Sequence, residues 1–446
     1  MMRVRGLLIA VIVLAALAAA VYWSNREKKE AENKPSPDAA PKVLSIPQDQ
    51  FQQIGIAKAG TEALVIRKAG SGNWEMVAPK QWPVDQDAVA GLVSALSSLD
   101  SSRVVEEKMS DAAQFGLASP SLEVRILRKD GKTARLLLGD DSPAGGGSFA
   151  KVDGDPRVFT IATFNKSSLD KSPVDLRDKR LLTFDQEKLT RVELKAKGGA
   201  IEFGKNNQNE WQIIRPEPLR ADGGQVEELV RKLKDTRMEV STDEEAKKAA
   251  AAFASAKLVA TVRTTDASGT QQLEVRKDKD NNYYAKSSVV EGIQKVNTYT
   301  GEGLDKGLDD FRNKKLFDFG FSEPSRVEIR DGVRQSVYQQ SGGKWFLAGK
   351  QMDAPSVQAL VDRLRDLSAI KFLKQGGGSP VLEAAVTFGD GKRTERVFIS
   401  KQGNSYFARR ENEPAIYELD GMTVEDLQKT AGSVKAYQPP QQQKKK

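Results

Sequence analysis

Apolar residues recur at helical spacing in three separate parts of the chain. In each part a Val is followed by apolar residues three, four and seven positions later, which places all four on one face of a helix. An Asp stands four positions before each Val, where its carboxylate can accept hydrogen bonds from amides of the first helical turn. The three sets are Asp85 with Val89, Leu92, Val93 and Leu96; Asp222 with Val226, Leu229, Val230 and Leu233; and Asp353 with Val357, Leu360, Val361 and Leu364. We therefore expect three equivalent amphipathic helices.

Alternating apolar residues follow each helix and predict half-buried strands. They are Leu122, Val124 and Ile126; Leu258, Ala260 and Val262; and Leu382, Ala384 and Val386. Turn residues come next in each case, so each strand is expected to return as a hairpin. Other motifs recur at matching positions, namely Trp74, Trp211 and Trp345 before the helices, and Phe149-Ala150-Lys151, Tyr284-Ala285-Lys286 and Phe407-Ala408-Arg409 after the hairpins.

These recurrences predict an α+β fold of three tandem units, each a small antiparallel sheet with a packed helix. The expected boundaries are 43–180, 181–315 and 316–437. Each unit is long enough to bury a core of its own. A short helix is expected at the end of each, around Leu169, Leu304 and Leu427.

The N-terminal segment carries a different pattern, an uncharged apolar run from Leu7 to Trp23. Its length, the basic Arg3 and Arg5 before it and the aromatic residues at its end predict a transmembrane signal-anchor over residues 1–23. Ala18 to Ala20 also fit a cleavage site, which leaves a cleaved signal peptide as the alternative. The anchor interpretation predicts a single-pass protein of the bacterial inner membrane with its bulk in the periplasm. Residues 24–42 are expected to form a linker, and 438–446 a disordered basic tail.

Composition then excludes several classes of chemistry. The chain has no Cys and no His, so disulfides, thiol nucleophiles, Cys/His zinc sites and imidazole bases are impossible. The formal charge of +8 lies mostly in the two tails, and no cluster of basic and aromatic residues predicts a nucleic-acid groove. We expect no cofactor and no metal, and identify no small-molecule substrate.

Two motifs with a chemical meaning fail when the repeats are compared. Ser148 and Lys151 have the spacing of a serine nucleophile and its lysine base, but Tyr283 and Tyr406 replace the Ser in the other units. The run from Asp278 to Asn282 begins like a calcium loop, yet Tyr283 stands where such a loop needs Gly. We therefore expect no enzymatic activity.

Two further motifs mark the ends of the units. Leu176-Arg-Asp-Lys-Arg-Leu-Leu-Thr-Phe184 matches Phe311-Arg-Asn-Lys-Lys-Leu-Phe-Asp-Phe319, and Phe115-Gly-Leu-Ala-Ser-Pro120 matches Phe319-Gly-Phe-Ser-Glu-Pro324. Together with the N-terminal apolar run and the repeated Trp, these motifs resemble the bacterial family catalogued only as domain of unknown function 4340. Members of that family are often encoded beside an ABC transporter with a gliding-motility-like auxiliary subunit. The resemblance implies an envelope complex with a protein partner such as a permease or auxiliary subunit.

Two functional hypotheses follow. The first is a non-enzymatic, membrane-anchored accessory or scaffold subunit of an envelope complex, which docks an acidic partner through basic junction residues. The candidate residues are Arg177, Lys179, Arg180, Arg312, Lys314 and Lys315. The alternative is an envelope glycan-binding module that uses the repeated Trp faces, although packing of each Trp onto the helix of its own unit is the favoured role of these residues.

Overall fold

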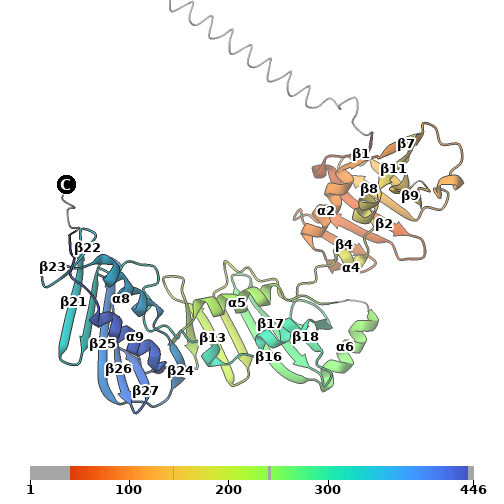
Figure 1. Ribbon diagram of the computed structural model, residues 1–446. Helices are drawn as coiled ribbons and strands as arrows, with labels where there is room; N and C mark the ends of the chain where they lie inside the picture. Colours follow the sequence, from red (N-terminus) through yellow and green to blue (C-terminus); the bar gives the residue numbers. More distant parts are fainter. Residues whose placement is uncertain (1–40, 144, 240–242, 440–446) are drawn as a thin grey trace, which may run out of the picture. The chain divides into compact units, whose positions relative to one another are not determined.

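The computed structural model describes residues 41–143, 145–239 and 243–439. The predicted anchor over residues 1–23 lies outside these residues, as do nearly all of the linker and of the basic tail. Among the described residues, no helix is both long and apolar enough to cross a bilayer. The described chain divides into two compact bodies, one ending at Lys179 and the other beginning at Arg180 (Figure 1).

The first body contains one nine-stranded antiparallel sheet. In spatial order its strands are β5 (Trp82–Pro83), β4 (Trp74–Ala78), β3 (Leu64–Lys68), β2 (Phe51–Lys58), β8 (Leu122–Arg128), β9 (Thr133–Asp141), β10 (Gly147–Val152), β11 (Val158–Ala162) and β7 (Arg103–Glu106). A small pair, β1 (Lys42–Ser45) and β6 (Ser98–Asp100), lies beside it. The helical elements are η1 (Gln48–Gln50), α2 (Gln86–Ser97), η2 (Ala113–Phe115), α3 (Thr163–Leu169) and α4 (Pro173–Leu176).

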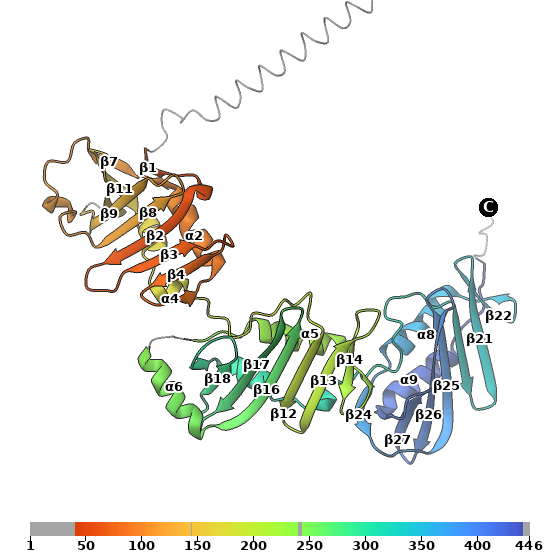
Figure 2. The ribbon, with the colours of Figure 1, turned by 180° about the vertical axis from the view of Figure 1, so that it is seen from behind.

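The second body contains two further sheets (Figure 2). One has eight strands, β15 (Leu219–Arg220), β14 (Trp211–Arg215), β13 (Gly199–Lys205), β12 (Arg191–Ala196), β16 (Lys257–Asp266), β17 (Gly269–Lys277), β18 (Tyr283–Ser287) and β19 (Ile293–Val296). The other has nine, β23 (Lys350–Gln351), β22 (Lys344–Leu347), β21 (Arg334–Ser341), β20 (Arg326–Asp331), β25 (Ser379–Phe388), β26 (Arg393–Gln402), β27 (Ser405–Arg410), β28 (Ile416–Leu419) and β24 (Ala369–Leu373). The helical elements are α5 (Gly223–Lys234), α6 (Asp243–Ser255), α7 (Thr298–Leu304), η3 (Leu308–Asp310), α8 (Ala354–Asp366) and α9 (Gly421–Gly432).

The α+β prediction with small sheets is therefore wrong. The described residues form mostly antiparallel sheet, in three large sheets that share one strand order, and the helices are the minor part. The prediction underestimated the sheets, because the strands before each main helix and those after it join into one sheet of eight or nine strands. The predicted transmembrane helix is not part of the described fold. We call the three sheets with their helices the first, second and third repeat.

The three amphipathic helices are confirmed as α2, α5 and α8. Each starts directly after its predicted Asp, whose side chain accepts an amide hydrogen bond of the first turn, as Asp222 does from Gln225 N at 3.1 Å. All twelve predicted apolar residues of the three helices are buried against their own sheets. The terminal helices α3, α7 and α9 are also found where the sequence predicted them.

Each of these main helices is held at both ends by the chain that enters and leaves its repeat. On entry, the amides of Ile46, Leu181 and Leu316 donate to carbonyls at or just after the C-terminal end of the helix, each at 3.0 Å. On exit, the amide of the N-cap Asp donates to a carbonyl of the departing chain, at 2.9 Å for Asp85, 2.7 Å for Asp222 and 2.9 Å for Asp353. The third repeat lacks the junction motif but closes in the same way, through Lys435 and the pairing of Met352 with Ala436.

Candidate functional site

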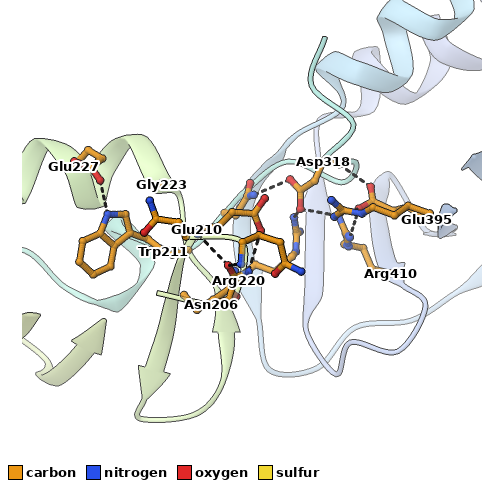
Figure 3. Close-up of a pocket in the computed structure, with 15 residues that line it drawn as sticks. Asn206, Glu210, Trp211, Arg220, Gly223, Glu227, Asp318, Glu395 and Arg410 are labelled. Atoms are coloured by element: carbon orange, nitrogen blue, oxygen red, sulfur yellow. Dashed lines mark hydrogen bonds and ion pairs between the residues drawn. The ribbon is translucent and has the colours of Figure 1, made fainter. Parts of the chain in front are cut away.

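A cavity of about 910 Å³ lies where the second repeat meets the third (Figure 3). One wall comes from the β13–β14 turn, β14 and the start of α5. The other wall comes from the segment that enters the third repeat and from β26 and β27. Its lining is polar, with five amide side chains and seven charged ones. These residues are Asn206, Gln208, Asn209, Gln212 and Asn313, and Glu210, Arg220, Glu227, Asp318, Arg393, Glu395 and Arg410.

Arg220 of β15 reaches from the second repeat into the third. Its guanidinium forms an ion pair with Asp318 and donates to the carbonyl of Lys315 at 2.7 Å. It also donates to the Tyr417 hydroxyl at 3.1 Å. Its Nε is buried 2.9 Å from Glu413 Oε1 without hydrogen-bond geometry, so that contact is an ion pair only. Arg220 is thus the charged link between the two repeats.

Arg410 of β27 completes the cluster from the third repeat. Its guanidinium donates to the Leu316 carbonyl at 2.8 Å and pairs with Glu395 at 3.2 Å and Glu413 at 2.9 Å. Glu395 in turn accepts the amide of Asp318 at 2.7 Å. The side chains of Arg410 and Glu395 are each only 10% exposed, so these charges are largely removed from water. We call Arg220, Asp318, Glu395, Arg410 and Glu413 the charged set.

Burial and charge act in opposite directions on the pKa values of Arg220 and Tyr417. Burial works to lower the pKa of Arg220, but Asp318, Tyr417 and Glu413 outweigh it and raise that pKa above its ordinary value. Burial raises the pKa of Tyr417, while the Arg220 charge opposes the rise. The charged set contains two guanidinium groups and three carboxyl groups. Each member of the charged set has a partner within the set, which is the arrangement of a structural ion-pair network.

The tryptophans of the repeats lie mainly in the cores. Trp211 and Trp345 are 5% and 4% exposed and belong to the cores of the second and third repeats. The Trp211 indole N–H, which borders the cavity, donates to Glu227 at 2.5 Å. Trp74 is half-buried against the core of the first repeat. The aromatic faces of Trp211 and Trp345 are therefore turned into protein rather than toward a ligand.

The six predicted docking residues are distributed over both bodies. Arg177 and Lys179 lie in the first body, where the Arg177 guanidinium is 4.3 Å from the centre of the Trp82 ring. Arg180 begins the second body and pairs through its backbone with Arg237.

The remaining three docking residues lie together at the entry of the third repeat. The Arg312 guanidinium stacks 3.6 Å from the Phe372 ring centre and pairs with Asp309 at 3.2 Å. Lys315 Nζ is 3.5 Å from Asp366, and Lys314 is exposed. Docking of a partner on these residues stays a prediction.

Sequence reasoning missed the charged set because its members are far apart in the chain and come from two repeats. One signal was present in the junction motifs, where Asp318 stands at the position of Thr183. Among the described residues, no group of three or more Asp or Glu could hold a metal ion.

Comparison with protein families shows which family the chain belongs to. The family described as "Domain of unknown function (DUF4340)" matches residues 74–212 and 211–383. The chain belongs to this family. The first match contains α2, and the second contains both α5 and α8. No curated protein is similar enough to the chain to be matched.

Proposed function

We propose that this DUF4340 member is a non-enzymatic accessory or scaffold subunit of a bacterial envelope complex. In this proposal the apolar run from Leu7 to Trp23 attaches the chain to the inner membrane, and the repeats lie outside the cytoplasm. The partner is an envelope protein, such as a permease or auxiliary subunit of an ABC-type transporter.

The observation that carries the proposal is that the residues of the charged set pair with one another and join two repeats. A cavity lined by so many charged and amide side chains would be a natural place for acid–base or nucleophilic groups. Its buried charges instead pair with one another and join the second repeat to the third through Arg220. A chain that spends its buried charges on joining repeats is suited to presenting large outer surfaces to partners.

Burial of the tryptophans weighs against the glycan-binding alternative. A sugar-binding platform needs an aromatic face open to solvent, and Trp211 and Trp345 are buried in their own repeats. Acrylamide quenching of tryptophan fluorescence in single-Trp variants provides the test. We expect weak quenching at Trp211 and Trp345, and unchanged quenching when peptidoglycan fragments are added. Protection of any Trp by such fragments would favour the alternative.

The scaffold proposal is tested by recovery of tagged full-length chain from its native membrane in mild detergent, with co-purifying proteins identified by mass spectrometry. We expect transporter subunits with the wild-type chain and loss of them with Lys179→Glu combined with Lys314→Glu. Lys344→Glu in β22 is the matched control, because it reverses an exposed charge away from the junction motifs. Recovery of the bait alone, or equal loss with the control, would contradict the proposal.

A further inference from the structure

The three repeats differ in one connection. It follows the main helix and leads into the strand that joins the two halves of the sheet, namely β8, β16 or β25. In the first repeat this connection is residues 107–121, between β7 and β8. In the second repeat it contains α6. In the third repeat it is only residues 374–378, Lys-Gln-Gly-Gly-Gly, between β24 and β25. Since the strand order is shared, the three connections lead into the same strand of the sheet.

In the first repeat this connection covers the sheet face opposite the main helix. The Phe115 and Phe149 rings pack edge to face with their centres 5.0 Å apart. Leu117, Leu137 and Val158 complete a small second core that is separate from the core beneath α2. The outer face of the middle strands is thus closed by an aromatic side chain from the connection.

In the second repeat α6 takes the same place with a different structure. It packs on β18 and β19 and buries Phe253, whose ring centre lies 4.6 Å from the guanidinium carbon of Arg276. Ala249 of α6 lines a cavity of about 220 Å³ with Tyr284 and Ile293. Both covered repeats therefore place one Phe from the connection over the same region.

In the third repeat the equivalent face is open among the described residues. Arg409 pairs with Phe398 and Ile416 across the sheet, as Lys151 pairs with Leu137 in the first repeat, so Phe398 and Ile416 stand where Leu137 and Val158 do. Phe407 matches Phe149 in the same motif.

These side chains border a groove of about 580 Å³. The short connection enters it only with glycines. A Cβ on Gly376 would come within 2.9 Å of Ile416 Cγ2, so only Gly fits against the floor at this position.

We propose that this groove binds a segment of a partner protein that inserts one aromatic side chain and carries acidic residues around it. The aromatic residue takes the place that Phe115 and Phe253 take in the other repeats, against Phe407 and Ile416. This inference deepens the proposed scaffold role by naming one docking surface of the chain.

The basic residues around the groove are the reason for expecting acidic residues in the bound segment. Arg330 and Arg409 line it, and Arg409 lies with its guanidinium carbon 5.9 Å from the centre of the Phe398 ring. The one carboxylate of the lining, Glu383, is already paired with Arg396 and lies 3.9 Å from Arg330. The groove thus offers the exposed Arg409, beside an Arg330 that is shared with Glu383, to complement an acidic ligand. The chain's own residues 438–446 do not match it, since they carry three Lys, no acidic residue and no aromatic residue.

The first repeat supplies a probe of the right chemistry. A fluorescent peptide copying residues 107–121 contains Phe115 together with Glu107 and Asp111. We expect a saturable rise in its anisotropy when it is mixed with the purified full-length chain. The same peptide with Phe115→Ala should bind at least about tenfold more weakly, because the buried aromatic anchor is lost.

Two variants of the chain place the binding in the groove. Arg409→Glu reverses an exposed charge at the groove and should weaken binding about tenfold or more. Lys286→Glu is the matched control, because it changes the equivalent exposed position of the second repeat, where α6 covers the sheet, and should leave binding unchanged. Equal unfolding midpoints of the two variants show that both remain folded.

Three results would overturn the inference. They are the absence of binding at millimolar peptide, binding that is indifferent to Phe115→Ala, and equal binding by the Arg409→Glu chain. Dimerisation in sedimentation velocity that Arg409→Glu abolishes would also overturn it, since the occupant would then be a second copy of the chain. Because peptide binding is measured on the isolated chain, it fails or succeeds independently of the membrane pull-down that tests the scaffold role.

Discussion

The second and third repeats use different side chains to bind the same backbone groups of the chain that enters them. In both, the chain that enters the repeat exposes a carbonyl, at Leu181 or Leu316, and an amide two residues later. In the second repeat Ser287 Oγ donates to the carbonyl at 2.5 Å and Gln271 accepts the amide of Thr183 at 2.8 Å. In the third repeat Arg410 and Glu395 perform these two roles for Leu316 and Asp318.

The uncharged residues bind only the entering backbone, whereas the charged ones can also bind a residue of the preceding repeat. We call Thr183, Gln271 and Ser287 the neutral set; its hydrogen bonds satisfy the backbone of the entering chain and involve no charged side chain. The charged set satisfies the same backbone groups and leaves Asp318 and Glu413 able to receive Arg220 from the preceding repeat. The position of Arg220 in the exit pairing is held by Pro83 in the first repeat, which carries no group for such a link. The charged set accompanies the one junction that lies inside a single compact body.

Arg410→Ala gives the largest expected effect. It removes the closest cation from the largely buried Glu395 and leaves Glu413 with Arg220, and we expect a loss of about 3–5 kcal/mol in the stability of the third repeat. Ser287→Ala, its counterpart in the neutral set, removes a hydrogen bond to the Leu181 carbonyl and one from the Val289 amide, and should cost about 1–2 kcal/mol. Native-state hydrogen exchange of the full chain measures each repeat separately. Similar losses from the two variants would show that the sets do not differ in energy.

Arg220→Ala tests the link between the repeats and is expected to have a smaller effect. Asp318 keeps Asn313 at 2.8 Å and Arg410 at 3.6 Å, so we expect a loss of about 2 kcal/mol. The readout is proteolysis of native protein at residues 311–318, which should become faster. Pro83→Ala provides the control in the first repeat. Unchanged cleavage after Arg220→Ala would mean that the ion pairs do not hold the junction closed.

Alkaline pH should destabilise the third repeat more than the second. The reason is Tyr417, which occupies the position of Gln294 in the second repeat. Its raised pKa means that the folded state favours the neutral phenol. That contribution is complete below the ordinary tyrosine pKa near 10 and is lost as pH rises from there to the folded value. We expect third-repeat exchange protection to fall above about pH 10. Tyr417→Phe should reduce this fall, and an unchanged fall in that variant would assign it to other groups.

Gln271→Glu gives the smallest expected effect and adds one charge to the neutral set. The new carboxylate can still accept the Thr183 amide, but it loses the donation to Thr183 Oγ1, now 3.1 Å, and faces no Arg like Arg410. We expect a loss of about 1 kcal/mol in the second repeat. Adding Ser287→Arg should restore it if the two sets are interchangeable. Failure of that rescue, measured by the same exchange experiment, would show that packing as well as charge distinguishes the repeats.

The sequence predicted the parts of the fold that depend on local pattern. The apolar stripes of the main helices, their Asp caps and the strand containing Val124 are found as expected, because each follows from spacing within a few residues. The size of the sheets was missed, because strands that lie before and after the main helix in the sequence pair with each other, as β12 does with β16 and β20 with β25. The charged set was missed for a similar reason. Arg220, Asp318 and Arg410 become neighbours only when two repeats are placed side by side.

The clamps on the main helices determine how a repeat would carry tension along the chain. A pull on the segment before Leu181 meets the hydrogen bond to the Thr236 carbonyl, and a pull on the segment after Phe311 meets the one from Asp222. Both bonds lie at the ends of α5. Force between the two ends of the second repeat is therefore borne by both ends of its main helix, together with the hydrogen bonds of the same segments to β15, β17 and β18. A chain stretched between two attachment points would load this helix at both of its ends in each repeat.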